Sequence, residues 1–324
     1  MRKTTRNVLI GTSVAAASAA IGGTMSYLMT KNLIEIALDR KEPKNLAKGK
    51  DFLSGVKGFS EIAEEFKTFA SDLENCGCED VEIVSRDGIR LVGHWYECEN
   101  AERVIIAMHG WRSSWSSDFG AISSFWHNNK CSVLYAEQRG QNNSGGNYMS
   151  FGLLERYDCL DWIYWVMERT WSSLPIYLGG VSMGATTVLM ASGLDLPDKV
   201  KGIVSDCGFT SPKAIWEHVA ESNLHLPYRL CSLMADELCL KKIQMRAGDY
   251  STVDAMKVCH IPVMFIHGTD DTFVPIEMTY ENYKACASPK RLLVVPGANH
   301  AMSYFLNREE YESAMKSFWK EYDC

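Results

Sequence analysis

The chain has 324 residues, of which 46% are hydrophobic, and its 33 Lys and Arg against 40 Asp and Glu give a net charge of −7. This composition predicts a folded core of one large or two small domains and excludes a disordered or collagen-like chain. The acidic balance, without a stripe of basic and aromatic residues, excludes nucleic acid as a partner, because phosphate neutralisation supplies most of the non-specific binding energy.

The N-terminal segment has the features of a membrane anchor. Asn7–Thr30 carries no charge, and as a helix it would be roughly 36 Å long, enough to cross a bilayer. Arg2, Lys3 and Arg6 precede it and favour a cytoplasmic start. We therefore expect residues 1–31 to form a single-pass helix in the cell membrane, with the body on the extracytoplasmic side.

Two other interpretations of this segment stay open. Ala17-Ser18-Ala19 is compatible with cleavage of a signal peptide, which would leave a secreted protein, and a soluble amphipathic arm is the third possibility. Beyond it, Lys31–Ser71 has a helical pattern rich in Lys and Glu. It predicts a helical linker or stalk over residues 32–80, packed on the domain that follows.

The body, residues 81–324, alternates apolar runs with helical stretches. A turn at Arg86-Asp87-Gly88 predicts a hairpin, and later runs are apolar throughout, as in parallel strands covered on both faces. The predicted strands are Val81–Ser85, Leu91–Tyr96, Val104–Met108, Ser132–Ala136, Ile176–Leu178, Gly202–Val204, Val263–Ile266 and Leu292–Val295. The order predicts an α/β fold, with an eight-stranded, mostly parallel sheet and helices on both faces. The helical residues at about 208–260 exceed a plain crossover and predict a small lid.

The strongest chemical signal is Gly180-Val181-Ser182-Met183-Gly184, between an apolar run and a helical one. This context is that of a nucleophile elbow, in which a tight turn needs glycine at 180 and 184 and exposes the serine hydroxyl. A serine needs a base to take its proton, and His300 follows the last strand. Asp271 follows the preceding strand and would orient the imidazole. Asp206 and Asp270 are the alternatives for the acid.

These motifs make the chain resemble the α/β-hydrolase superfamily, and in particular its bacterial membrane-anchored, cell-surface serine hydrolases. The resemblance extends from about Val81 to Phe318 and places the acid of the H-G-x-x-D-x-x-V-P segment on Asp271 and the base of the G-x-x-H segment on His300. It implies an oxyanion hole made by the backbone N–H groups of Trp111 and Met183. His109 lies in the same loop as Trp111, and we expect it to brace the loop rather than to act as a base.

The segment Glu137–Ser144 resembles the D-x-R-G-x-G-x-S loop of the superfamily, with Glu137 and Asn142 as departures. Asn tolerates left-handed backbone, so the turn can persist, and Arg139 is expected to hold loops together. Apolar residues of the lid, together with Trp111, Trp115 and Trp216, favour an acyl or aromatic group in the substrate pocket. Arg112 is either a contact for a substrate carboxylate or a solvated surface charge.

The sequence thus predicts a serine hydrolase that cleaves carboxylic esters or related small acyl compounds through an acyl-enzyme. It contains no metal-binding, P-loop or Rossmann motif, so neither cofactor nor metal is expected. A peptidase of the prolyl-oligopeptidase type is a rival, although such enzymes usually carry a β-propeller before the hydrolase domain and residues before 81 have a helical pattern. An acyltransferase and a non-catalytic binding protein are further alternatives. Most of the eleven cysteines are expected to be reduced thiols.

Overall fold

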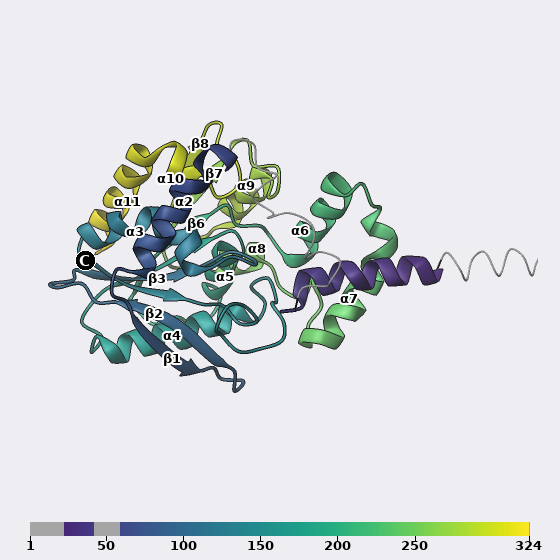
Figure 1. Ribbon diagram of the computed structural model, residues 1–324, viewed down its shortest axis with the longest axis horizontal. Helices are drawn as coiled ribbons and strands as arrows, with labels where there is room; N and C mark the ends of the chain where they lie inside the picture. The colour runs from purple at the N-terminus through teal and green to yellow at the C-terminus, as the bar shows by residue number, and fades with distance from the viewer. Residues whose placement is uncertain (1–22, 42–58, 324) are drawn as a thin grey trace, which may run out of the picture.

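The core of the molecule is one twisted sheet. The computed structural model describes residues 23–41 and 59–323, and in this part of the chain the sheet has eight strands in the order β1-β2-β4-β3-β5-β6-β7-β8. The strands are β1 (Glu79–Val84), β2 (Arg90–Tyr96), β3 (Arg103–Met108), β4 (Cys131–Ala136), β5 (Ile176–Val181), β6 (Val200–Asp206), β7 (Val263–Gly268) and β8 (Lys290–Val295). β2 pairs antiparallel with β1 and β4, and the remaining pairs are parallel. The predicted eight-stranded, mostly parallel sheet is confirmed (Figure 1).

Helices cover both faces of this sheet, which explains why β3, β4 and β7 are buried along their whole length. One face packs on α4 (Glu155–Arg169), α5 (Met183–Ala191), α8 (Thr252–Val258) and α9 (Ile276–Ala285). The other face packs on α2 (Phe59–Glu74), α3 (Trp115–Asn128), α10 (Ser303–Leu306) and α11 (Arg308–Tyr322). The two hydrophobic layers hold the strand ends, and hence the loops that follow them, in fixed positions.

The helix α2 belongs to this packed body. It crosses α3 at Gly120, where a Cβ would lie 2.6 Å from the backbone carbon of Phe69, so only glycine permits this approach. Ser116 of α3 also donates to the Glu74 carboxylate at 2.6 Å. The segment predicted as a linker therefore contributes a helix to one layer of the domain.

A third group of helices extends beyond the sheet. It consists of α6 (Pro212–His218), the short π-helix η2 (Val219–Asn223) and α7 (Tyr228–Ile243), all between β6 and β7 (Figure 1). We call these residues, 212–243, the lid helices. The predicted lid of residues 208–260 is too long, because α8 packs against α5 and α9, on the face of the sheet that α4 also covers.

The helix over residues 23–38 lies against α7 (Figure 1). Thr30, Ile34 and Leu38 are buried, and Ile34 and Leu38 join the apolar cluster of the lid helices. After Leu38 the chain turns, because Asp39 bridges to Tyr148 and the Arg40 N–H donates to the Asn147 carbonyl at 2.8 Å. The helical pattern expected over Lys31–Ser71 is therefore interrupted after Leu38.

The predicted membrane span falls largely outside the described residues, which begin at 23. Among the helices that the structure does describe, none combines the length and the apolar character needed to cross a membrane. The last residue of the predicted span, Thr30, is buried against protein.

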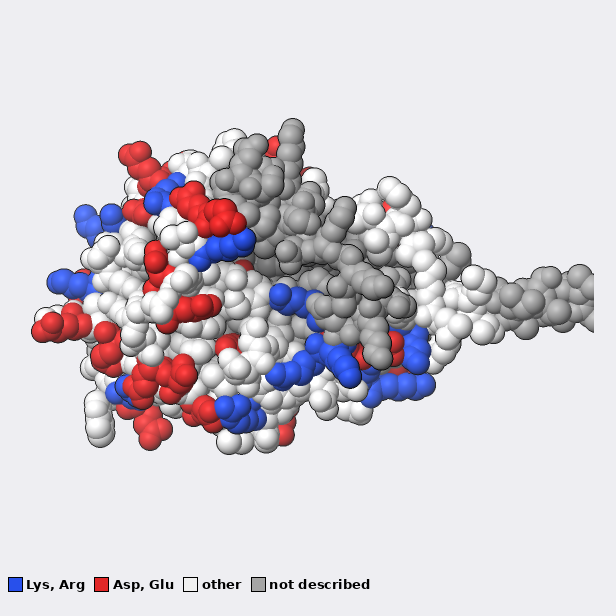
Figure 2. Space-filling view, viewed as in Figure 1, with Lys and Arg blue, Asp and Glu red and all other residues white. Residues whose placement is uncertain are grey.

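Charge is unevenly spread over the visible surface. Figure 2 shows acidic side chains over the end of the molecule that carries β1–β3 and α11, and Lys and Arg side chains near the lid helices.

The ten cysteines in the described part of the chain are free thiols, of which Cys131, Cys159, Cys207, Cys239, Cys259 and Cys286 are buried.

Candidate active site

Ser182 lies in a strained turn between β5 and α5. Its φ of 55° and ψ of −115° are unusual for a residue with a side chain. The turn closes because both flanking residues lack a Cβ: one at Gly180 would lie 2.3 Å from the backbone of Gly184, and one at Gly184 would lie 1.8 Å from the Met108 carbonyl oxygen. The sequence motif therefore has the geometry of a nucleophile elbow, with the serine side chain at the carboxyl end of the strand.

The His300 imidazole lies directly opposite this serine. The loop between β8 and α10 carries it to the same edge of the sheet, where its Nε2 is 2.9 Å from Ser182 Oγ. Both side chains are almost completely buried. An imidazole nitrogen at this distance can accept the hydroxyl proton directly.

Asp271 completes the chain of hydrogen bonds. Its Oδ2 is 2.7 Å from His300 Nδ1, and its Oδ1 accepts the backbone N–H groups of Phe273 and Val274, each at 2.9 Å. Burial alone would raise the pKa of Asp271, but the two neighbouring imidazoles, of His300 and His267, and their hydrogen bonds hold it well below its ordinary value. The carboxylate is therefore ionised, and Nδ1 of His300 carries the proton that it donates to Asp271.

His267 is a partner of the acid that the sequence analysis did not identify. Its Nε2 donates to Asp271 Oδ2 at 3.1 Å and to the Val274 carbonyl at 2.9 Å, and its Nδ1 accepts from Thr279 Oγ1 at 2.7 Å. The i, i+4 spacing of His267 and Asp271 across the turn after β7 was the available signal. His267 acts on the site through Asp271, whose orientation it fixes.

The two alternative acids lie elsewhere. Asp270 is exposed and accepts from Thr269 Oγ1. Asp206 is buried and accepts from Ser303 Oγ at 3.1 Å, and burial raises its pKa to about 6. Neither has a hydrogen bond to His300 among the described contacts, so the structure favours Asp271 as the residue that orients the imidazole.

Cys207 is a second neighbour of His300 that the sequence analysis did not identify. It follows the end of β6, and its sulfur lies within 4.8 Å of a ring nitrogen of the imidazole. Burial opposes a charged His300, but Cys207 and the Asp271 carboxylate raise its pKa above the ordinary value. The imidazolium that forms after proton transfer is thus stabilised by its surroundings.

The loop after β3 lies beside the serine and carries Trp111, the predicted oxyanion donor. The Asp118 carboxylate holds the preceding Gly110 N–H at 2.6 Å. From the other side, the Trp111 indole donates to the Ala37 carbonyl at 2.9 Å, and the Arg112 guanidinium donates to the carbonyls of Ile36 and Asp39, each at 2.7 Å. Arg112 is therefore neither a solvated charge nor placed as a substrate contact: it ties the loop to the end of the helix over residues 23–38.

The predicted structural role of His109 agrees with its contacts. The ring is buried, its Nδ1 donates to the Gly110 carbonyl at 2.8 Å, and its Nε2 accepts the Gln138 N–H at 3.1 Å. Burial lowers the pKa of His109, so the ring stays neutral. Both nitrogens are used to brace the loop, and none is available as a base.

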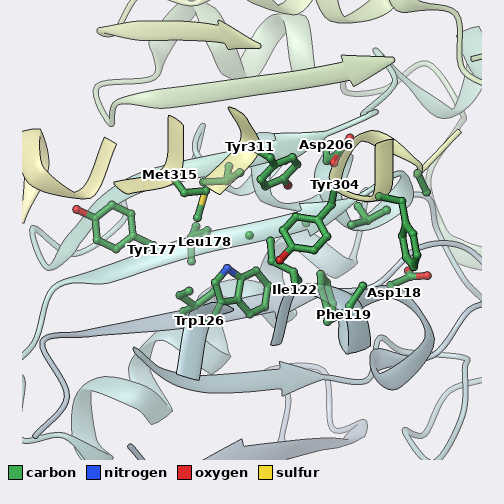
Figure 3. A pocket seen from close by; sticks show the side chains of 18 of the residues that line it. Asp118, Phe119, Ile122, Trp126, Tyr177, Leu178, Asp206, Tyr304, Tyr311 and Met315 are labelled. Atoms are coloured by element: carbon green, nitrogen blue, oxygen red, sulfur yellow. The ribbon is translucent and has the colours of Figure 1, made fainter. Parts of the chain in front are cut away.

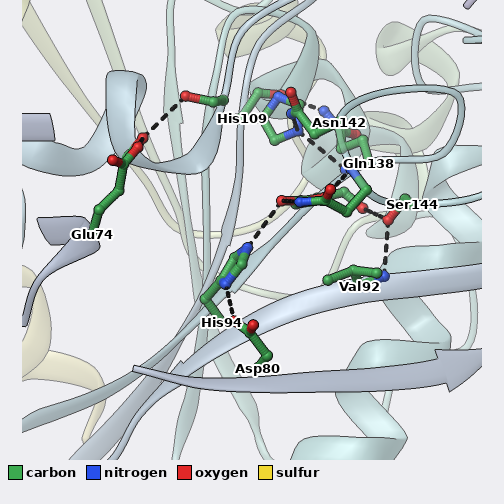
Figure 4. Close-up of polar contacts among 12 residues, drawn as sticks. Glu74, Asp80, Val92, His94, His109, Gln138, Asn142 and Ser144 are labelled. Carbon is green, nitrogen blue, oxygen red and sulfur yellow. Dashed lines mark hydrogen bonds and ion pairs between the residues drawn. The ribbon is translucent and has the colours of Figure 1, made fainter. Parts of the chain in front are cut away.

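The loop after β4 is held by buried ion pairs, as expected for Arg139, which donates to Asp158 at 2.6 Å and to Asp87 at 2.7 Å. Asn142 has a φ of 45°, the left-handed backbone that its side chain tolerates. The two ring nitrogens of His94 contact Glu137 at 2.9 Å and Asp80 at 2.7 Å, and Figure 4 shows His94 above Asp80. This network supports the loop and does not reach the serine.

Two of the three predicted pocket tryptophans lie near the site. Trp111 and Trp216 flank Phe151, with ring centroids at 6.2 and 5.5 Å, in the apolar cluster of the lid helices. Trp115 does not belong to this pocket. It begins α3 and stacks on His94 at 4.1 Å in the cluster below the opposite face of the sheet, since the turn at 112–114 directs it there.

A small, partly open cavity lies on that opposite face, between the sheet and α3, α10 and α11 (Figure 3). Its volume is about 50 Å³, and its walls include Trp126, Tyr177, Tyr304 and the buried Asp206. This space fits one or two waters rather than an acyl group. Neither Trp111 nor Trp216 lines this cavity.

Comparison with known proteins agrees with this geometry. Residues 117–323, more than half of the chain, match the model of the prolyl oligopeptidase family. An uncharacterised protein of Bacillus subtilis, YqkD, is 30% identical over 57% of this chain and 61% of its own length, so this chain spans less than two thirds of that relative. YfhR of Escherichia coli K12, also uncharacterised, is 26% identical over 68% of this chain and 73% of its own.

Solved structures show the same fold. The esterase Pf2001 of Pyrococcus furiosus superposes with a TM-score of 0.63 at 22% identity, covering 76% of this chain and 92% of its own. The acylaminoacyl peptidase of Pyrococcus horikoshii superposes with a TM-score of 0.57 at 17% identity, over 76% of this chain and 41% of its own. At these identities the likeness establishes the α/β-hydrolase fold.

Proposed function

The chain belongs to the prolyl oligopeptidase family of serine hydrolases, and we propose that it cleaves carboxylic esters through an acyl-enzyme on Ser182. The observation that carries the proposal is the continuous hydrogen-bonded line from Ser182 Oγ through His300 to Asp271 at the elbow. Each residue of that line has the partner that its proposed role requires.

The proposed reaction has two halves. Ser182 Oγ attacks the substrate carbonyl while its proton passes to His300 Nε2, and the N–H groups of Trp111 and Met183 stabilise the oxyanion. The imidazolium then gives its proton to the departing alcohol as the carbon–oxygen bond breaks. In the second half, water loses a proton to His300 and attacks the acyl-enzyme, and Ser182 recovers its proton as the carboxylic acid leaves.

Covalent labelling tests the catalytic role. We expect a fluorophosphonate probe to label the full-length protein and to leave Ser182→Ala unlabelled. Equal labelling of both proteins would place the nucleophile elsewhere. No labelling of either, with both folded, would support the alternative of a non-catalytic protein on a hydrolase fold.

Peptide cleavage is the second candidate, favoured by the family match and by the fold shared with an acylaminoacyl peptidase. An amide nitrogen must be protonated before it can leave, whereas a phenolate leaves without that help, so ester cleavage asks less of the same triad. Rates on p-nitrophenyl esters of increasing acyl length, compared with rates on aminoacyl p-nitroanilides, distinguish the two activities. Formation of a new ester between the acyl group and an added alcohol, in place of the carboxylic acid, would indicate acyl transfer.

We further propose that the N-terminal segment anchors the protein in the cell membrane with the catalytic body outside. The proposal rests on the uncharged run Asn7–Thr30 behind three basic residues. Membrane fractionation with N-terminal sequencing tests it. A soluble mature chain beginning near Ala20 would show signal cleavage instead.

A further inference from the structure

The catalytic edge holds a side chain that the proposed reaction does not use, the thiol of Cys207. This residue follows β6 with a φ of 50°, and its N–H donates to the Ile266 carbonyl at 3.0 Å. Its sulfur, a carboxylate oxygen of Asp271 and a ring nitrogen of His300 all lie within 4.8 Å of one another, and all three residues are buried. In residues 23–41 and 59–323, this is the one group of three His, Cys, Asp or Glu side chains close enough to share a metal ion.

The three donors are those that zinc prefers. Thiolate, imidazole and carboxylate bind Zn²⁺ at about 2.0–2.3 Å, and three protein ligands leave a fourth position open in a tetrahedral site. Ser182 Oγ is 2.9 Å from His300 Nε2, so the imidazole that would bind zinc is the one that faces the nucleophile. A zinc ion with one thiolate and one carboxylate is neutral as a unit, so its burial carries little of the cost of an isolated charge.

We propose that Cys207, His300 and Asp271 form an inhibitory site for Zn²⁺, through which the metal switches off the triad. The inference takes the triad of the proposed function as its starting point. Zinc replaces the thiol proton of Cys207, which leaves to solvent, and a zinc–sulfur bond forms without any change of oxidation state. A neutral imidazole has one lone pair, and when zinc takes it the other ring nitrogen carries the proton, so His300 cannot accept the proton of Ser182 and acylation stops.

The first experiment measures p-nitrophenyl ester hydrolysis by the full-length protein in buffered free Zn²⁺. We expect inhibition that a chelator reverses. In Cys207→Ser the zinc concentration for half inhibition should rise by more than the ~10–100-fold typical of losing an outer-shell partner. Cys98→Ser is the matched control, because Cys98 lies near the start of β4, where its N–H donates to Ser132, at the opposite edge of the sheet. Equal inhibition of all three proteins, or none of the wild type, would overturn the proposal.

A second measurement does not depend on activity. Co²⁺ added to full-length Ser182→Ala should give the near-ultraviolet thiolate-to-cobalt absorption, and this band should be lost in Ser182→Ala/Cys207→Ser. If Ser182→Ala shows the band but the wild type hydrolyses no ester, the metal site stands and the proposed function is refuted. An active esterase without the band or the inhibition retains the function and refutes the metal site.

Discussion

At the catalytic edge each polar atom of the triad has a partner, whereas the neighbouring lid helices bury several polar atoms that have none. Asp271 alone receives hydrogen bonds from two imidazoles and two backbone N–H groups. Within the described residues, the buried atoms without a partner include Trp216 Nε1, His218 Nε2, Tyr228 Oη and Asp236 Oδ1. Such groups cost about 1–3 kcal/mol each. The hydrogen bonds of the edge are therefore complete before any substrate binds, whereas the unpartnered polar atoms lower the stability of the lid helices.

The largest expected effect is on the edge. Replacing the base with His300→Gln removes the proton acceptor while keeping a side chain of similar length. We expect turnover of p-nitrophenyl esters to fall by ~10⁶, as for Ser182→Ala, because members of a triad act as a unit. A loss below about a hundredfold, in a variant with unchanged thermal unfolding, would mean that His300 is not the base.

Asp271→Asn should lower turnover by ~10⁴, less than His300→Gln does. The substitution leaves the nucleophile and the base in place but favours the wrong tautomer of His300. The pH profile supplies a second readout. His300 must be neutral to act, and its pKa is raised, so wild-type activity should appear as pH rises above 6.5. Loss of the carboxylate should move this limb to lower pH. An unmoved limb would count against Asp271 as the partner of the base.

The next largest effect on turnover is expected where the catalytic edge contacts the end of the helix over residues 23–38. Arg112→Gln removes the hydrogen bonds to Ile36 and Asp39 that hold the loop bearing Trp111. A small misplacement of an oxyanion donor costs up to ~10² in rate. We expect kcat to fall with little change in KM, and Arg112→Lys to recover part of it. A change confined to KM would instead indicate that Arg112 contacts substrate.

The smallest effects compare one hydroxyl from each region. Tyr228→Phe removes an unpartnered buried hydroxyl of the lid helices and should raise the free energy of unfolding by about 1 kcal/mol. Thr187→Val removes a buried hydroxyl that donates to the Met183 carbonyl at 2.9 Å, and should lower it by about 1 kcal/mol. Denaturant unfolding without substrate measures both. Equal destabilisation by the two substitutions would remove the distinction between the regions.

The elbow and the three residues that it brings together were predictable because local rules determine them. The Gly180 and Gly184 positions follow from steric exclusion in one turn, and the parallel strands must deliver Asp271 and His300 to the same edge. These rules operate over a few residues or over whole strands, so the sequence displays them directly.

Other parts of the site depend on contacts that no local pattern shows. The partners of Arg112 lie more than seventy residues away, and Cys207 meets His300 only because β6 ends where it does. Trp115 was assigned to the pocket from its nearness in sequence to Trp111, but a tight turn sends it below the opposite face of the sheet. The few residues between Trp111 and Trp115 in the sequence do not show that the two side chains lie on different sides of the sheet.

The attachment of residues 34–40 has a consequence for how the protein folds. These residues leave the ribosome early, yet Leu38 and Arg40 pair with residues near 147–149, and Asp39 accepts from Lys242 at 2.6 Å. Docking is complete only when residue 242 of the 324 is present, after about three quarters of the chain has been synthesised, and closing such long loops is slow. Maturation of the loop that carries Trp111 should therefore be a late folding event.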